Sequence, residues 1–170
     1  MMGKEIERKF LIHDLTPVLR MAWDNSKYAN YDICQAYIRS GVRVRVQVRR
    51  PPHEREVHYY LTVKTKRKGI ERKEFTFEIT EEEGKNLLDE FKDTSVKKSR
   101  HIFEYKGKIW EIDVFREDNR GLFIAEIELE DKDEEYEIPP GICEEVTDDE
   151  RYYNSNLAKN PYRNWSKENE

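Results

Sequence analysis

The chain has 170 residues, of which 31 are Lys or Arg and 36 are Asp or Glu, so its formal net charge is −5 and 39% of its residues are charged. This acidic balance argues against a general nucleic-acid coat or a polybasic membrane anchor, and no apolar run approaches the ~18 residues that a transmembrane helix needs. The two cysteines, Cys34 and Cys143, have no metal-site or disulfide-scaffold spacing, which is typical of a cytoplasmic protein.

Alternation of apolar and polar residues dominates the chain and is typical of antiparallel β-strands. The first such segment, residues 5–11, places Glu5, Glu7 and Lys9 on one face. The second, residues 42–49, reads VRVRVQVR and separates a wholly apolar face from a basic one. The same alternation predicts further strands over residues 60–64, 72–79, 110–114 and 126–129, and a weaker form of it predicts one over 98–103.

Turn-forming residues separate these strands and predict short connections between antiparallel neighbours. The predicted turns lie at residues 50–53, 66–69, 106–108 and 117–121.

Helical periodicity appears in three places. Residues 15–23 repeat apolar side chains at helical spacing, with Thr16 and Pro17 as the expected N-cap and first turn. Thr80 and Glu83 form a capping-box pattern before a second helix. Residues 148–159 predict a third, short helix. We expect one domain over residues 1–165 and a frayed tail over 166–170.

Like charges recur two residues apart on the predicted strands, where they repel one another. The pairs are Glu5 and Glu7, Arg43 and Arg45, and Glu126 and Glu128. The ordinary interpretation is a sheet with one solvated face. Such pairs are better explained if acids and bases face one another across an enclosed space. We therefore predict an α+β fold in which antiparallel strands close into a β-barrel around a charged lumen, with helices covering the apolar outer face.

The predicted lumen carries both signs of charge. Its bases are Lys9, Arg43, Arg45, Lys64, Arg72, Lys98 and Arg100. Its acids are Glu5, Glu7, Glu74, Glu78, Glu111, Asp113, Glu126 and Glu128. Such a set of bases suits a polyphosphate, because guanidinium groups match phosphate oxygens. The carboxylates would repel that ligand unless they hold hard cations, so we expect Mg²⁺ or Mn²⁺, in a site for two ions.

Other interpretations of the charged segments are weaker. Residues 43–50 could be a nucleic-acid strand, but no aromatic residues interleave with the bases. The four histidines share no ligand spacing. We also find no base-stacking pattern on the charged face, which favours recognition of phosphates over a nucleobase.

Residues 5–11 (EIERKFL) resemble the N-terminal ExExK signature of the CYTH superfamily, also called triphosphate tunnel metalloenzymes. A lone match of this kind is weak, but here the resemblance continues in order along the chain. It extends through residues 35–37, 42–45, 61–64, 72–74, 98–100, 110–113, 125–129, 145–148 and 151–158. The compact ending resembles the short bacterial branch, in which inorganic triphosphatases are common.

This resemblance implies an eight-stranded antiparallel tunnel and metal-dependent chemistry on a triphosphate. By residue, it implies Glu5, Glu7 and Glu126 as ligands of a first metal. Asp113 and Glu128, with Glu74 or Glu78, are similar to the residues that place a second metal or orient water. The seven lumen bases resemble the phosphate-binding set, and we expect Lys9 to neutralise the leaving oxygen. His101, Gln47 and Arg49 depart from the family pattern at the tunnel mouth.

The leading hypothesis is a phosphohydrolase that converts inorganic triphosphate to phosphate and pyrophosphate. An adenylate cyclase of the class IV type and a thiamine triphosphatase could use the same tunnel. A non-enzymatic polyphosphate-binding module is a further alternative, although phosphate binding alone does not require the paired carboxylates. We expect a small-molecule triphosphate as the partner, and neither a nucleic acid nor a membrane.

Overall fold

The computed structural model describes residues 2–25, 28–39, 41–49, 56–66 and 71–167, while the side chains of residues 2–5, 48, 49, 71, 166 and 167 lie outside that description. The described strands are β1 (Met2–Ile12), β2 (Tyr31–Arg39), β3 (Val42–Arg49), β4 (Glu56–Lys64), β5 (Glu71–Ile79), β6 (Ser95–Tyr105), β7 (Lys108–Phe115), β8 (Phe123–Glu128) and β9 (Ile142–Glu145). The described α-helices are α1 (Leu15–Asp24), α2 (Glu81–Glu90) and α3 (Asn154–Leu157).

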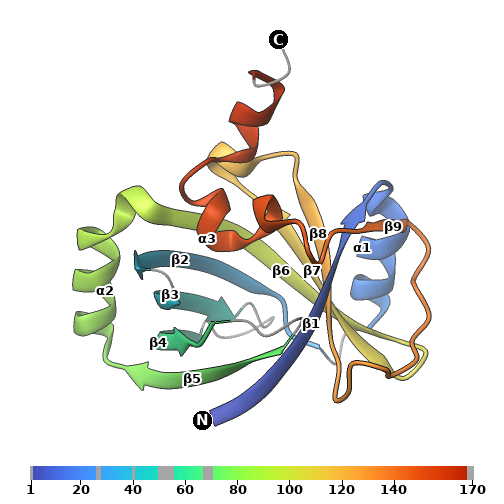
Figure 1. The fold of residues 1–170 in the computed structure, drawn as a ribbon, viewed down its shortest axis with the longest axis horizontal. Coiled ribbons are helices and arrows are strands. Elements are labelled where there is room, and N and C mark those ends of the chain that lie inside the picture. The colour runs from blue at the N-terminus through green and yellow to red at the C-terminus, as the bar shows by residue number, and fades with distance from the viewer. Residues whose placement is uncertain (1, 26–27, 40, 50–55, 67–70, 168–170) are drawn as a thin grey trace.

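These strands form one sheet in the order β5-β4-β3-β2-β6-β7-β8-β1-β9 (Figure 1). Every described pairing is antiparallel. The N-terminal half of β1 also pairs with β5, from Met2 opposite Phe75 to Ile6 opposite Glu71. The predicted α+β class with a large antiparallel sheet is confirmed. Alternation predicted neither β2 nor β9, a short strand beside β1.

The predicted turn at residues 106–108 is confirmed and has a specific cause. Lys106 and Gly107 both have positive φ angles, 51° and 78°, and they link Tyr105 to its partner Lys108. Two positive φ angles in a two-residue loop are the geometry that matches strand twist in a hairpin. The predicted turn at 50–53 lies outside the described residues, as do residues 67–69 of the turn at 66–69.

Two helix predictions need correction. α1 begins at Leu15, and its N-cap is Asp14, whose carboxylate accepts a hydrogen bond from Thr16 N at 2.9 Å; Thr16 is therefore not the cap. The single helix predicted over residues 148–159 is divided into a 3-10 turn (Glu150–Tyr152) and α3. Tyr153 interrupts it, because its backbone is extended at φ −72° and ψ 132°.

The capping box before α2 is confirmed. The Thr80 side chain accepts from Glu83 N at 3.3 Å, while the Glu83 carboxylate accepts from Thr80 N at 2.9 Å. This fixes the start of α2, which packs against β3 and β4 on one flank of the sheet (Figure 1).

Strand register places the predicted charged residues on one side of the sheet, because opposed residues of antiparallel strands point the same way. The opposed pairs include Glu7 with Glu128, Lys9 with Glu126, Glu111 with Glu126, Arg100 with Asp113, Lys64 with Glu74, and Arg43 with Thr62. We call this side the charged face. His101 follows Arg100 directly on β6 and therefore lies on the other side.

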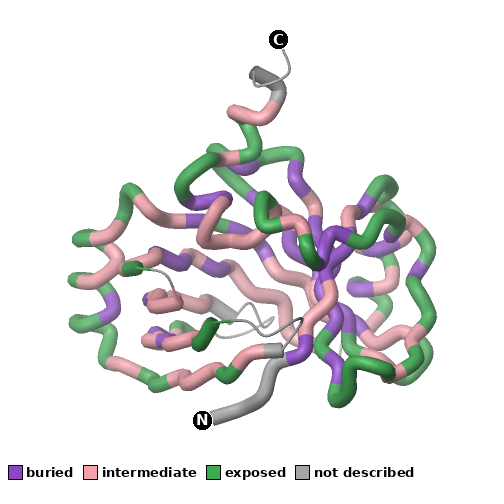
Figure 2. The backbone as a smooth tube through the Cα atoms, in the orientation of Figure 1, coloured by how far each residue is buried: buried purple, intermediate pink, exposed green. Residues whose placement is uncertain are grey.

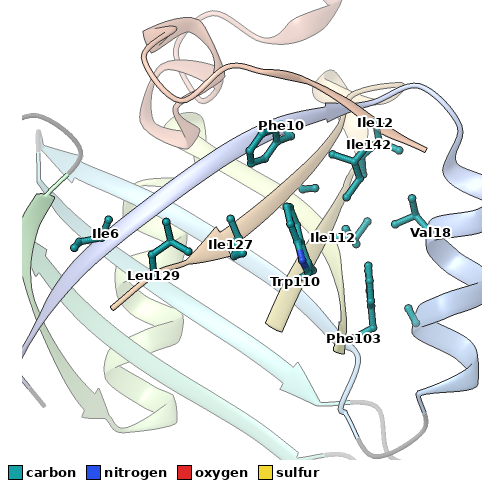
Figure 3. Packing of buried hydrophobic residues seen from close by; sticks show 12 residues of the cluster. Ile6, Phe10, Ile12, Val18, Phe103, Trp110, Ile112, Ile127, Leu129 and Ile142 are labelled. Atoms are coloured by element: carbon teal, nitrogen blue, oxygen red, sulfur yellow. The ribbon is translucent and has the colours of Figure 1, made fainter. Parts of the chain in front are cut away.

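The other side of the sheet is apolar and carries the main core. Buried residues concentrate where β1, β7 and β8 run together beside α1 (Figure 2). Phe10, Trp110 and Ile127 pack there and are at most 1% exposed, and Val18 of α1 covers the same cluster (Figure 3). None of the described helices is long and apolar enough to span a membrane.

Gly84 lets α2 approach β4 closely, and Gly84→Ala should therefore destabilise the fold. A Cβ atom at this position would lie 2.6 Å from Tyr59 Cγ. Helix propensity alone favours alanine by ~1 kcal/mol, whereas overpacking at a buried contact costs ~1–3 kcal/mol. Urea unfolding should show a net loss for Gly84→Ala. The exposed Asn86→Ala in the same helix should be neutral or stabilising, and equal behaviour of the two variants would contradict this account.

Candidate active site

The charged face lines a cavity of about 910 Å³. All seven predicted bases contribute to its wall: Lys9, Arg43, Arg45, Lys64, Arg72, Lys98 and Arg100. They come from β1, β3, β4, β5 and β6, so segments far apart in sequence supply one basic enclosure.

The predicted acids divide by position. Those that line the cavity are Glu7, Glu74, Glu111, Glu126 and Glu128. Glu78 does not: its side chain is 64% exposed, and its carboxylate lies 2.9 Å from His58 Nδ1. Parity along β5 left Glu74 and Glu78 equivalent, and the structure separates them. The side chain of Glu5 lies outside the described part of the chain, although its backbone pairs with Arg72.

One group of charges lies where β1 meets β8. The Lys9 ammonium contacts the carboxylates of both Glu7 and Glu126, and all three side chains are at most 13% exposed. Burial alone would lower the pKa of Lys9, but the two carboxylates raise it above its ordinary value. Burial opposes ionisation of Glu126, yet Lys9 and Arg100 hold the pKa of this carboxyl well below its usual range. Both groups are therefore charged at neutral pH.

A second group of charges lies between β6 and β7. Arg100 donates from Nε to Asp113 Oδ1 and from Nη2 to Asp113 Oδ2, both at 2.7 Å. Its Nη2 also donates to Glu126 at 2.6 Å, and its Nη1 contacts Glu111. The Lys98 ammonium contacts the same Asp113 carboxylate. Burial raises the pKa of Glu111, which also lies near Glu126 and Asp113.

A third group of charges is centred on Glu74. Its carboxylate lies 2.5 Å from Lys64 Nζ and 3.5 Å from Arg43 Nη2, and it accepts from Thr76 Oγ1 at 2.9 Å. Burial would raise the pKa of Glu74, but Lys64 and Arg43 lower it to about 2. Glu74 therefore stays ionised and holds two of the cavity bases.

Arg45 is a cavity base that lies against an aromatic ring. Its guanidinium lies 5.3 Å from the centre of the Tyr60 ring, and its Nε is buried with no hydrogen-bond partner in the described structure. Burial, together with Arg43 and Arg100, lowers the pKa of Arg45 to about 10. The fold stabilises this cation only weakly, so its charge is available to bind an anion that enters the cavity.

Sequence reasoning missed several neutral residues of the cavity wall. They are Ile33, Gln35, Tyr37, Tyr153, Asn154, Ser155 and Asn156. Gln35 is 2% exposed and donates to the Tyr37 hydroxyl at 2.7 Å. Burial raises the pKa of Tyr37 to about 12, so this phenol is neutral. Tyr37 and Tyr153 thus bring aromatic rings to a cavity wall on which the sequence showed no base-stacking pattern. The match at residues 35–37 was the available signal, but β2 alternates too weakly to show which side they face.

Within the described ranges, no three His, Cys, Asp or Glu side chains gather closely enough to hold a metal ion. In this structure, Lys9 and Arg100 lie among the acids instead.

Comparison with known proteins agrees with this architecture. The CYTH domain model matches residues 3–159. The chain belongs to the CYTH domain family. An inorganic triphosphatase of Acetivibrio thermocellus is 39% identical to this CYTH domain over 166 residues, which cover 96% of this chain and 99% of that protein. An inorganic triphosphatase of Nitrosomonas europaea is 28% identical over 158 residues, covering 91% and 96%.

A solved structure is also similar to this CYTH domain. The crystal structure of the inorganic triphosphatase NE1496 aligns with a TM-score of 0.60 at 25% identity, over 91% of this chain and 93% of that one.

Glu74→Gln should destabilise this CYTH domain by about 2 kcal/mol at pH 7, because it leaves Lys64 and Arg43 without their shared carboxylate. A lowered carboxyl pKa stabilises the folded state above the ordinary pKa. That contribution should therefore disappear as the pH falls from about 5 to about 2, and the variant's stability should depend less on pH across this interval.

Urea unfolding at pH 7 and pH 3 measures both effects. Glu78→Gln is the matched control on the same strand, and its effect should stay within ~0.5 kcal/mol because its ion pair is exposed. Equal losses of unfolding free energy for the two variants at pH 7 would show that Glu74 contributes no more to stability than the exposed Glu78.

Proposed function

We propose that this protein is a metal-dependent hydrolase that converts inorganic triphosphate to phosphate and pyrophosphate. The observation that carries this proposal is the convergence of all seven predicted bases on one cavity that also contains carboxylates. The relatives named inorganic triphosphatase support the choice of substrate, since one of them is 39% identical over nearly the whole chain.

The proposed binding site is a tunnel formed by a closed eight-stranded barrel, β1 to β8. Support comes from the additional pairing of β1 with β5, the two strands that would complete such a ring. Closure would let bases from opposite walls contact one linear polyphosphate on several sides. Arg43, Arg45 and Lys64 would bind it from one wall, and Lys98 and Arg100 from another.

The carboxylate oxygens where β1 meets β8 are the ligand type that a hard divalent cation prefers. The position already attracts a cation, because the Lys9 ammonium contacts both Glu7 and Glu126. We assign Glu7, Glu126 and Glu128, with Glu5, to hold Mg²⁺ or Mn²⁺. When bound, such an ion would polarise the phosphoryl group and offset its negative charge.

The chain's own residues would supply positioning and electrostatic stabilisation. In the proposed reaction, a water oxygen forms a bond to the terminal phosphorus while the bond from that phosphorus to the bridging oxygen breaks, and pyrophosphate leaves. The cavity bases would stabilise charge on the phosphoryl oxygens, and Lys9 the charge on the leaving oxygen. Glu128 lines the cavity, so its carboxylate would orient the attacking water and accept its proton.

A substrate panel tests this function. Purified protein with Mg²⁺ or Mn²⁺ should release phosphate from inorganic triphosphate with a kcat/KM at least tenfold above those for ATP and thiamine triphosphate. Preferential turnover of thiamine triphosphate would show that this compound, and not inorganic triphosphate, is the substrate. Formation of cyclic AMP from ATP would show that the protein is an adenylate cyclase. Tight binding of triphosphate in EDTA with no turnover under any metal would indicate a binding module.

Arg45→Met should raise KM and lower kcat, reducing kcat/KM by at least about tenfold, because a charge-assisted hydrogen bond to phosphate is lost. The metal-free melting temperature should stay unchanged or rise, since the folded state already disfavours the charge on this residue. Arg20→Met on α1 is the exposed control. Normal kinetics for Arg45→Met would place this residue outside the substrate path.

The single domain over residues 1–165 and the cytoplasmic location stay predictions.

A further inference from the structure

Asp113 occupies an unusual position for a residue expected to bind metal or orient water. Its residue exposure is 0%, and it is not among the residues that line the cavity. Its neighbours on the charged face, Lys98 and Arg100, do line the cavity. A carboxylate behind the wall therefore supports two bases that form the wall.

Both oxygens of Asp113 are already engaged. Oδ1 accepts from Arg100 Nε and Oδ2 from Arg100 Nη2, each at 2.7 Å, in a bidentate arrangement. Oδ2 also contacts the Lys98 ammonium. A bidentate pair fixes the plane of a guanidinium as well as its position. In this arrangement, the Nη1 edge of Arg100 is directed to Glu111 and part of Nη2 to Glu126, both of which line the cavity.

Lys98 and Arg100 also need a compensating charge. They lie two residues apart on β6 and point the same way, and the Lys98 side chain is 2% exposed. Two like charges so close together in a buried site repel each other strongly. Asp113 contacts both bases, whereas Glu111 and Glu126 contact only Arg100 of the two in the described structure, so Asp113 compensates the pair together.

We propose that Asp113 is a positioning residue, which sets Lys98 and Arg100 at the cavity wall for phosphate binding and neither binds metal nor orients the attacking water. This inference rests on the proposed triphosphate site. It divides the predicted carboxylates by role: Glu7, Glu126 and Glu128 would serve the cation, whereas Asp113 serves the anion through two bases.

Asp113→Asn tests the proposal, since it removes the charge and nearly keeps the shape. Two titrations are made by calorimetry: inorganic triphosphate in EDTA, and Mn²⁺ alone without triphosphate. We expect the Kd for triphosphate to rise at least tenfold and the Kd for Mn²⁺ to change less than twofold. In the phosphate-release assay, KM should rise at least tenfold, with a smaller fall in kcat.

Two controls separate positioning from other effects. Glu128→Gln should give the opposite pattern, with weakened Mn²⁺ binding and little change in triphosphate binding in EDTA. Ile112→Ala changes a buried residue next to Asp113 on the apolar side, so it measures the effect of reduced stability alone on binding. It should leave the Kd values for triphosphate and Mn²⁺ within twofold of those of the unmodified protein.

A tenfold loss of Mn²⁺ affinity in Asp113→Asn would make Asp113 a metal ligand and overturn the proposal, as would unchanged triphosphate binding. If Asp113→Asn does not fold, Lys98→Met is compared with Lys98→Met/Asp113→Asn, which removes the buried pair together. Mn²⁺ affinity of the double variant within twofold of Lys98→Met supports positioning, and a tenfold loss opposes it. Absence of turnover in the unmodified enzyme would refute the proposed function while leaving both titrations of Asp113→Asn interpretable.

Discussion

Compensation of buried like charges is the constraint on which this structure depends. Bases at alternate positions on a strand cannot share one face in a poorly hydrated space unless acids lie among them. The structure meets this requirement with three groups of charges, centred on the contacts of Lys9, Arg100 and Glu74. In each group a carboxylate contacts at least one base of the cavity wall, so binding and folding use the same side chains.

The same constraint explains why the apolar core lies outside the charged enclosure. Alternation along each strand sends one set of side chains to the charged face and the other to the opposite face. The second set packs with α1 around Phe10 and Trp110, while α2 covers the flank formed by β3 and β4. Two requirements therefore specify the strand register. A shift of one residue would bury the charged side chains in the core, and it would also place the apolar side chains in the cavity.

How well the sequence predicted each part depended on how local its signal was. Alternation, strict over residues 42–49 and weaker elsewhere, predicted one face for the seven bases, and all seven line the cavity. The capping box at Thr80 was correct because it involves two nearby residues. Position along a strand could not separate Glu74 from Glu78, since that difference depends on which end of β5 meets the cavity. The burial of Asp113 depends on packing between β6 and β7. The cavity wall at Tyr37 and α3 depends on packing between separate segments, since Tyr37 packs against the cluster that contains Leu157, and such packing leaves no periodic trace.

The wall contributed by α3 has a different origin from the rest of the enclosure. It is one helical turn, anchored by the fully buried Leu157, whose carbonyl accepts from Asn119 Nδ2 at 3.4 Å. Asn154 and Asn156 of this turn face the cavity without taking part in the sheet. In evolutionary terms, such a wall can change in sequence without altering strand register or the ion pairs. Substitutions in this turn would therefore change the size of the cavity while leaving the charged face of the sheet in place.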